Sequence, residues 1–347
     1  MWVALLFLMT GVASAQSPGD FTILDDILIE SSEDADSYMV NGVGAPSVAF
    51  DSRRGRYLMA FEVRLPETAD HCPAGLWGLG LAHSADGIHW VTGDRPLLRP
   101  REGTFYECVA AHPSVVYNEG NDSLYVFYKS EQGDDACSEE ERPWGCSRYT
   151  GVGRARVRFG GGAGMPRAIH VLGEPVLPRA TNMGFPRFVR QGGTNYLMFT
   201  EPPNAQIAVS TSFRDFEVAA DVAIPVSAAP ASWAEDELFN PAVVCEDSDE
   251  FPFKAFIGGR NVDGSSLILG GWGVAIGSSP TTWFLGAEPV VDWTSDTDWR
   301  HWDVLRVGAD DYLVYFSEKG EDNKPRIRLA LTSETWSDDG IDDKRCD

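Results

Sequence analysis

A hairpin pattern that recurs five times constrains this chain more than any other feature of its sequence. Each copy has an apolar stretch, a polar turn with Gly, Asn or Asp, and a second apolar stretch rich in Tyr and Phe. This pattern is typical of a β-hairpin. Pro follows the first residue in four copies, which suits the start of a strand. The copies start near Ala45, His112, Phe185, Asn240 and His301.

A third alternating stretch follows each hairpin, and in four copies it runs through a polar turn to an aromatic residue. The clearest example is GLGLAHSADGIHW at Gly78–Trp90. Helical periodicity is almost absent, and the chain contains 35 Gly and 21 Pro. Repeated three- or four-stranded units in such a chain predict an all-β fold, a five-bladed β-propeller. We expect Trp90, Trp283 and Trp336 to pack against neighbouring blades.

The two ends of the chain are predicted to lie outside this repeat. An apolar run followed by Ala13-Ser14-Ala15 has the form of a secretory signal peptide, which we assign to residues 1–15. Residues 16–44 form an N-terminal segment that is expected to close the last blade and to cover a sheet edge. The propeller itself is assigned to residues 45–347, so the protein is predicted to be secreted, either extracellular or periplasmic.

Six cysteines remain after the signal segment, an even number that favours disulfides in an exported protein. Cys137 and Cys146 bracket a short polar loop, so we expect these two to form a bridge. The other four, Cys72, Cys108, Cys245 and Cys346, allow three pairings, and the sequence does not select among them.

The net charge of −24 excludes several classes of partner. A surface this acidic repels nucleic acid backbones and anionic membranes. The run at the N-terminus is too short to span a bilayer, so no membrane insertion is expected. We predict a monomer that requires no cofactor and has no metal site. A structural calcium ion is the alternative that the acidic composition leaves open.

Candidate catalytic residues come from the strand ends that should meet at one mouth of the central channel. Glu62 lies five residues after Tyr57, and Glu201 lies five after Tyr196, so the two carboxylates are expected to face alike. Glu107 precedes the second hairpin on a loop that should reach the same mouth. Clustered carboxylates can supply the acid and the base that glycosidic bond cleavage requires.

Other residues at this mouth are candidates for binding a carbohydrate. The strand starts and ends contribute polar and cationic side chains, and nearby tryptophans offer flat apolar rings for sugar faces. The predicted binding set is His112, Asn240, Arg260, His301, Trp299 and Trp302, with Trp77 as a further stacking candidate.

The repeated hairpins, together with the S-x-D-G-x-x-W pattern at Ser84–Trp90, resemble the arabinanase and β-xylosidase family, glycoside hydrolase family 43. The resemblance covers Ala45 to Trp336 and implies a five-bladed propeller with an Asp base, an Asp that tunes the acid, and a Glu acid. The base is expected directly before the Pro of the first blade, where this chain has Ala45. The YEC stretch at Tyr106–Cys108 resembles the EC motif of invertases and levansucrases, whose Glu is the acid/base.

The departures from the family pattern leave two functions open. The second Asp is expected at an equivalent place in a later blade, where this chain has His112, Phe185 and Asn240. The first function is a glycoside hydrolase whose carboxylates are rearranged and drawn from Glu107, Glu62 and Glu201. The alternative is a propeller without catalytic activity that binds a carbohydrate or another surface ligand.

The predicted disulfide of the polar loop can be tested directly on exported protein. Peptide mapping without reduction should recover the Cys137 and Cys146 peptides as one linked species, because nine residues of separation let the two sulfurs meet without strain. Two free thiols at these positions would contradict both the bridge and the oxidising compartment.

Overall fold

Short antiparallel β-sheets follow one another along the whole described chain. The structure is a computed structural model, and it describes residues 21–72, 75–132, 150–160, 166–177, 183–219, 222–228, 233–246, 248–263, 266–286, 289–292, 301–308, 311–320, 322–332 and 346. Within these ranges the only helices are two single 3₁₀ turns, η1 (Glu119–Asn121) and η3 (Val226–Ala228). The all-β class predicted from the repeats is confirmed.

We divide the strands into five units, which we call blades; one parallel pairing, between Trp77 and Val109, joins the first two into a single sheet. The first blade contains β2 (Val43–Asp51), β3 (Arg56–Arg64), β4 (Trp77–Ser84) and β5 (Trp90–Thr92). The second contains β6 (Val109–Asn118), β7 (Ser123–Glu131), β8 (Thr150–Phe159) and β9 (Pro166–Val171). The third contains β10 (Gly184–Gln191), β11 (Thr194–Glu201), β12 (Asn204–Ser210) and β13 (Glu217–Val218).

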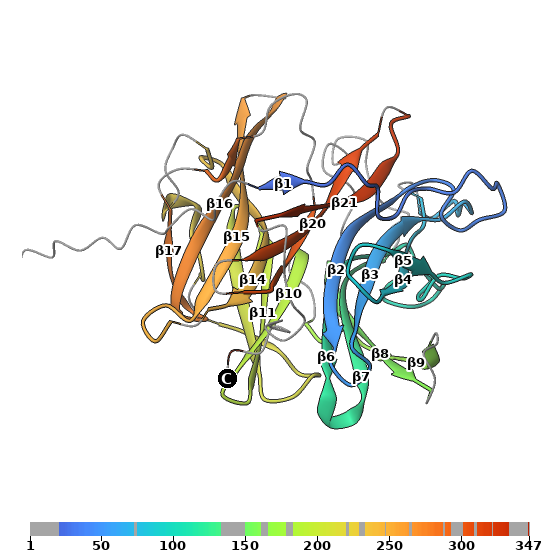
Figure 1. Ribbon diagram of the computed structural model, residues 1–347, viewed down its shortest axis with the longest axis horizontal. Coiled ribbons are helices and arrows are strands. Elements are labelled where there is room, and N and C mark those ends of the chain that lie inside the picture. The colour runs from blue at the N-terminus through green and yellow to red at the C-terminus, as the bar shows by residue number, and fades with distance from the viewer. Residues whose placement is uncertain are drawn as a thin grey trace, which may run out of the picture.

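The last two blades complete the series. The fourth contains β14 (Glu237–Cys245), β15 (Phe253–Asp263), β16 (Ser266–Ser279) and β17 (Thr282–Leu285), with β18 (Val291–Asp292) also paired to β16. The fifth contains β19 (Trp302–Arg306), β20 (Tyr312–Lys319) and β21 (Pro325–Leu331). Its outer strand is β1 (Thr22–Ile23), drawn in blue beside the red β21 in Figure 1. The N-terminal segment therefore supplies an edge strand to the last blade.

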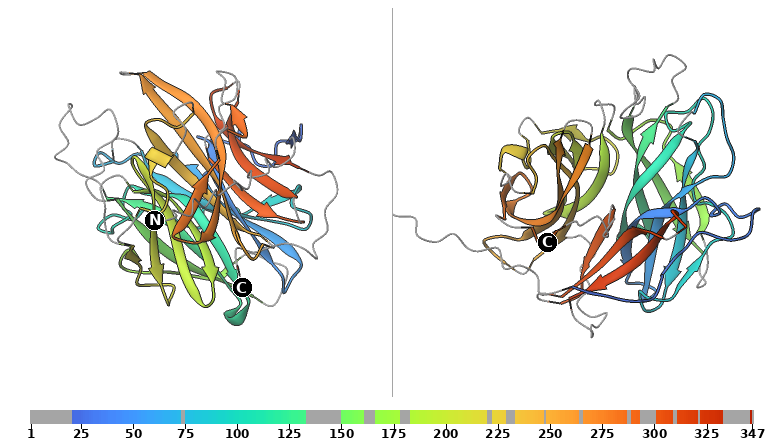
Figure 2. Two further views of the ribbon diagram at one scale, coloured as in Figure 1. Left: turned by 90° about the vertical axis from the view of Figure 1, so that its left-hand side faces the viewer. Right: turned by 90° about the horizontal axis from the view of Figure 1, so that it is seen from above.

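The inner strands of the blades close into a ring. Contacts run from β2 to β6, from β6 to β10, from β10 to β14, from β14 to β19, and from β19 back to β2. Seen from above in Figure 2, the red strands of the fifth blade stand between the orange strands of the fourth and the blue strands of the first. Five of the six hydrophobic clusters among the described residues lie between neighbouring blades, one for each pair. Burial between blades therefore holds the ring together.

The residue before proline has an unusual backbone at the start of four inner strands. Ala45, His112, Phe185 and Asn240 have φ values of 42°, 46°, 51° and 47°, in the left-handed region that residues other than glycine rarely adopt. In each case the register with the second strand shifts at this point, as it does in a β-bulge. We call these four residues the bulge residues, and we call this end of the channel the mouth.

One buried ion pair lies inside the ring and reaches all five blades. The Arg187 guanidinium of the third blade donates to the carbonyl oxygens of Pro113 in the second blade (2.7 Å) and Trp302 in the fifth (2.7 Å), and to Asn240 Oδ1 in the fourth (2.8 Å). Its Nε lies 3.9 Å from Asp303 Oδ1 of the fifth blade. Asp303 Oδ2 accepts hydrogen bonds from Ser47 Oγ and from the Val48 amide of the first blade, both at 2.8 Å.

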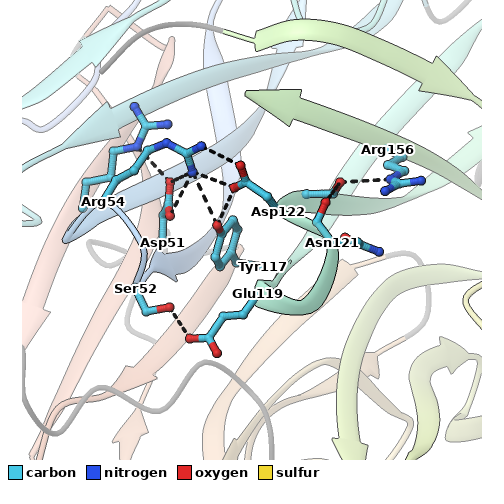
Figure 3. Close-up of polar contacts among 10 residues, drawn as sticks. Asp51, Ser52, Arg54, Tyr117, Glu119, Asn121, Asp122 and Arg156 are labelled. Carbon is cyan, nitrogen blue, oxygen red and sulfur yellow. Dashed lines mark hydrogen bonds and ion pairs between the residues drawn. The ribbon is translucent and has the colours of Figure 1, made fainter. Parts of the chain in front are cut away.

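A second ion network joins two hairpin turns at the opposite end of the strands from the mouth (Figure 3). Arg54 in the first blade makes two hydrogen bonds of 2.8 Å to the carboxylate of Asp122 in the second blade. It also lies 3.0 Å from Asp51, and Tyr117 donates to Asp122 at 2.6 Å. Unlike Arg187, Arg54 keeps 18% of its side-chain surface exposed.

Two disulfides are present among the described residues, Cys72–Cys108 and Cys245–Cys346. They select one of the three pairings that the sequence left open. The first links the loop between β3 and β4 to the residue directly before β6. The second links Cys346, near the C-terminus, to the last residue of β14. Cys137 and Cys146 lie outside the described residues. No helix formed by the described residues is long and apolar enough to cross a membrane.

The two ion networks should differ in their contribution to stability. We expect Arg187→Met to lower the free energy of unfolding by about 3–5 kcal/mol, because Asp303 would remain charged and buried. Arg54→Met, the matched control, should cost only about 1–2 kcal/mol, because solvent reaches Asp122 and because Asp51 keeps Arg56 as a second cationic partner. Equilibrium urea unfolding of both variants measures the difference. Equal losses would contradict the central role assigned to Arg187.

Candidate functional site

One position on the second strand of each blade faces the mouth. In the first four blades it pairs with the residue directly before the bulge residue, and in the fifth it lies two residues beyond Tyr315, the partner of Asp303. We call these positions the mouth ring. Its members are Glu62, Lys129, Thr200, Gly258 and Ser317.

Members of the mouth ring accept hydrogen bonds from the bulge amides of the following blade. A bulge removes its residues from the ladder, so the amide requires another acceptor. Three such bonds are described: Ala45 N–H to Ser317 Oγ (2.8 Å), Asn240 N–H to Thr200 Oγ1 (3.1 Å), and His112 N–H to Glu62 Oε2 (3.2 Å). Two blades therefore use a hydroxyl for this purpose, and one uses a carboxyl group.

Glu62 is almost completely buried, with 7% of its surface exposed. Burial raises its pKa to about 7, because a charged carboxylate loses its hydration there. The hydrogen bond from the His112 amide and the charge of Lys129 lower this pKa, and the charge of Glu131 raises it. The imidazole Nε2 of His112 lies 3.6 Å from Glu62 Oε2. Glu62 therefore changes its protonation near neutral pH.

A cavity of about 210 Å³ opens beside Glu62 at the mouth, between the fifth and first blades. Trp77 lies on its wall and presents an aromatic surface, and a second acidic residue, Glu318, is also among the lining residues. Glu318 accepts hydrogen bonds from Arg326 (3.3 Å) and Arg328 (3.0 Å), which balance its charge. The other lining residues are Gly44, His301, Ser317, Lys319, Asn323 and Pro325.

An aromatic layer lies across the inner strands beside this cavity. The ring of His112 stacks on Phe185 with centroids 4.1 Å apart, and it lies 5.0 Å from the ring of His301. Burial holds the pKa of His112 well below its usual range, and His301, Lys129 and Arg187 act in the same direction. His112 is therefore a neutral neighbour of Glu62 at physiological pH.

The three predicted carboxylates do not share one place. Glu62 lines the cavity, whereas Glu107 and Glu201 are absent from its described lining. Glu107 accepts a hydrogen bond from the Gly103 amide (3.0 Å) and so closes its own loop. Thr200, not Glu201, occupies the mouth ring, so Glu201 points to the other face of its strand. The expectation that Glu62 and Glu201 face alike was wrong.

The predicted binding residues also lie in different environments. His301 lines the cavity, and His112 lies against Glu62. Asn240 is fully buried and binds Arg187, and Arg260 pairs with Glu237 of the neighbouring strand.

The tryptophans proposed to stack on sugars divide in the same way. Trp302 is 1% exposed and stacks on Trp272, so it packs between the fourth and fifth blades and has no free face. This corrects its predicted role in sugar stacking. Trp299 lies outside the described residues. Trp90 meets Tyr315 of the neighbouring blade edge to face at 5.9 Å, as expected for a packing residue.

Several residues of the site were missed from the sequence. Ser317, Lys129 and Thr200 belong to the mouth ring only because of strand register, which a hairpin pattern does not determine. Arg187 and Asp303 could have been recognised in the sequence, because each lies two residues after a predicted hairpin start, Phe185 or His301. Charged residues at that place in an apolar strand indicate a buried pair.

One group among the described residues has the spacing of a metal site. It consists of His71, Cys72 and Cys108. The two cysteines form a disulfide with each other, so they offer no thiolate to a metal ion. This group is therefore part of a covalent link between the first two blades.

Comparison with known proteins identifies the fold. No protein-family model and no curated protein matches the chain. A candidate glycosidase from Bacteroides thetaiotaomicron matches in structure with a TM-score of 0.65 and 14% identity, over 91% of this chain and 97% of that one. A glycosyl hydrolase from Bacteroides ovatus gives 0.64 and 11%, over 92% and 96%. The β-1,2-mannobiose phosphorylase of Listeria innocua, in complex with β-1,2-mannobiose, gives 0.63 and 13%, over 90% and 96%.

These similarities show a propeller-type fold that glycoside hydrolases and a glycoside phosphorylase share. They do not single out the arabinanase and β-xylosidase family. A fold of this kind hosts different chemistries, so the function must be argued from the site.

The raised pKa of Glu62 makes a prediction about stability. The folded protein should keep the Glu62 proton up to about pH 7, whereas the unfolded chain loses it near 4.5. The stabilisation is fully present below 4.5 and is lost as the pH rises through 7, a difference of about 3 kcal/mol. Glu62→Gln should therefore remove this decline. Urea unfolding of both proteins at pH 4.5 and 8 tests it, and parallel pH profiles would contradict it.

Proposed function

We propose that this protein is a glycoside hydrolase in which Glu62 is the general acid. Its structural neighbours act on glycans and support a glycan-active protein. The cavity at the mouth combines a carboxyl group that titrates near neutral pH with an aromatic wall from Trp77. A protonated carboxyl group can donate its proton to the leaving oxygen of a glycosidic bond.

The observation that carries the proposal is a carboxyl group where the fold requires only a hydroxyl. Ser317 and Thr200 satisfy the equivalent bulge amides with neutral oxygens. A buried carboxyl group in the same place costs stability when it ionises. Glu62 is therefore more than a structural acceptor, and proton transfer to a ligand in the cavity explains its presence.

Glu318 is the second carboxylate of the proposed reaction. It lines the same cavity, and Arg326 and Arg328 hold it in place. In this proposal it accepts a proton from the attacking water while Glu62 donates one to the leaving group. The proton gained by the sugar oxygen and the hydroxyl gained by the anomeric carbon together balance one water molecule.

A glycan-binding propeller without catalysis is the second candidate. It is favoured by the bulge residues, because Ala45, His112, Phe185 and Asn240 include no carboxylate. The resemblance to the arabinanase and β-xylosidase family implies catalytic Asp residues at two such places. In this second function Trp77 would stack on a sugar and Glu62 would accept or donate a single hydrogen bond.

Export to an oxidising compartment is also proposed. It is supported by the two disulfides and by the Ala13-Ser14-Ala15 motif. Such a compartment suits a protein that meets polysaccharides outside the cell.

The test is a screen of purified protein against aryl glycosides and polysaccharides, including mannosides. Glu62→Gln and Glu62→Thr should both lose at least about 10²-fold in kcat/KM, because each removes the proton donor. Thr is the matched variant, because Thr200 occupies the equivalent mouth-ring position in the third blade and accepts the bulge amide there. Glu318→Gln should lose activity as well.

Two further variants separate the structural assignment from the sequence-based one. Glu107→Gln and Glu201→Gln should retain activity, because neither side chain lines the described cavity. Turnover that survives Glu62→Gln but not these changes would overturn the choice of Glu62. A protein that turns over nothing, yet is retarded by a polysaccharide in affinity electrophoresis, would establish the binding function instead.

A further inference from the structure

A lysine occupies the mouth ring directly beside Glu62. Lys129 pairs with Ala111, the residue before the second bulge, just as Glu62 pairs with Gly44 before the first. The Glu62 side chain reaches across to the second blade, where it accepts the His112 amide. The carboxyl group and the ammonium group are therefore neighbours around the ring, and the charge of Lys129 acts on Glu62.

This lysine is already paired with a different carboxylate. Lys129 Nζ forms an ion pair with Oε1 of Glu131, two residues further along the same strand. Residues two apart in a strand lie on the same face, which brings both side chains to the mouth. Both are mostly buried, with 16% and 20% of their side-chain surface exposed. Water therefore screens this pair only weakly.

We propose that Glu131 is a positioning residue that holds the Lys129 ammonium away from Glu62 and so keeps a proton on Glu62. A lysine freed from Glu131 would turn to the nearest other carboxyl group and favour its ionised form. The negative charge of Glu131 adds to the effect, because like charges disfavour ionisation. The proposal rests on the proposed function only for its catalytic consequence, since protonation of Glu62 is a property of the protein alone.

The other titratable groups around Glu62 have less effect on its pKa than Lys129 and Glu131. His112 of β6 is buried and neutral near pH 7. From the fifth blade, His301, Glu318 and Lys319 line the same cavity, and Glu318 is held by two arginines. A single substitution at Lys129 or at Glu131 of β7 can thus raise or lower the pKa of Glu62.

The experiment is a double-substitution cycle read at Glu62 itself. Carboxyl ¹³C chemical shifts of glutamate-labelled protein, assigned by comparison with Glu62→Gln, report its pKa in each variant. Glu131→Gln should lower the pKa of Glu62 by about one unit, because the freed ammonium pairs with it. Lys129→Met should raise it, since Glu131 then has no cation. The double variant should return to within about half a unit of the wild type.

Two control variants guard against indirect effects. Glu131→Asp retains the negative charge and should restore most of the wild-type pKa. Glu107→Gln removes a carboxylate outside the described lining of the cavity and should leave the pKa of Glu62 unchanged. If Glu131→Gln leaves the pKa of Glu62 unmoved, or if both single substitutions shift it in the same direction, the proposal is overturned.

The catalytic consequence is measured separately. Where turnover is found, the alkaline limb of the pH–rate profile should move to lower pH by about one unit for Glu131→Gln, matching the pKa change. Shifts of the Glu62 pKa without any glycan turnover would support this inference and count against the proposed hydrolase. Turnover that depends on Glu62, with a pKa insensitive to Glu131, would do the opposite.

Discussion

The buried pair of Arg187 and Asp303 is the interaction on which the ring depends. Sheets that meet edge-on around an axis leave a channel, and a dry channel lined by strand backbones has carbonyl groups that need donors. Arg187 supplies five N–H groups in a fixed planar arrangement. It satisfies carbonyls of the second and fifth blades and an amide of the fourth, while Asp303 reaches the first. One ion pair therefore fixes the relative positions of five blades whose other contacts are largely apolar.

The same pair supports the mouth. Asn240, a bulge residue, is oriented by Arg187, and the carbonyl that Arg187 binds belongs to Trp302, next to His301 on the cavity wall. Strained backbone at a site persists only where the surroundings determine it. Here proline follows each bulge residue, oxygens of the preceding blade accept three of the bulge amides, and Arg187 binds Pro113 and Asn240.

The sequence predicted the blades well because hairpins are local. Alternating apolar residues and the turns between them specify strand pairs, and the inner strands begin close to the predicted starts. Register across the hairpin is less local. Counting from Tyr57 and from Tyr196 predicted that Glu62 and Glu201 face the same side of their strands. The turn of the first hairpin, however, has four residues, whereas that of the third has only two, Gly192 and Gly193. Tyr57 and Tyr196 therefore sit at different heights, and Thr200 takes the place assigned to Glu201.

Burial also separates residues that look alike in the sequence. Trp77 and Trp302 were equally good candidates for stacking on a sugar, yet only Trp77 lines the cavity, because Trp302 fills the space between two blades above Gly258. A Cβ atom at Gly258 would lie 2.6 Å from the Trp302 ring, so the glycine and the tryptophan require each other. The pairing is a contact between residues 44 positions apart, and no local pattern records it.

The position of the carboxyl group is the final consequence of this architecture. In the family that the sequence resembles, acids are expected on the first strands before proline, where the bulge aims a side chain at the mouth. In this chain those places hold Ala45, His112, Phe185 and Asn240, and three of these side chains serve packing or the central ion pair. Glu62 stands on the second strand instead, one hydrogen bond from a bulge amide. Because a bulge amide can donate its hydrogen bond either to a hydroxyl or to a carboxyl oxygen, this position holds Glu62 in the first blade and Thr200 or Ser317 in two others.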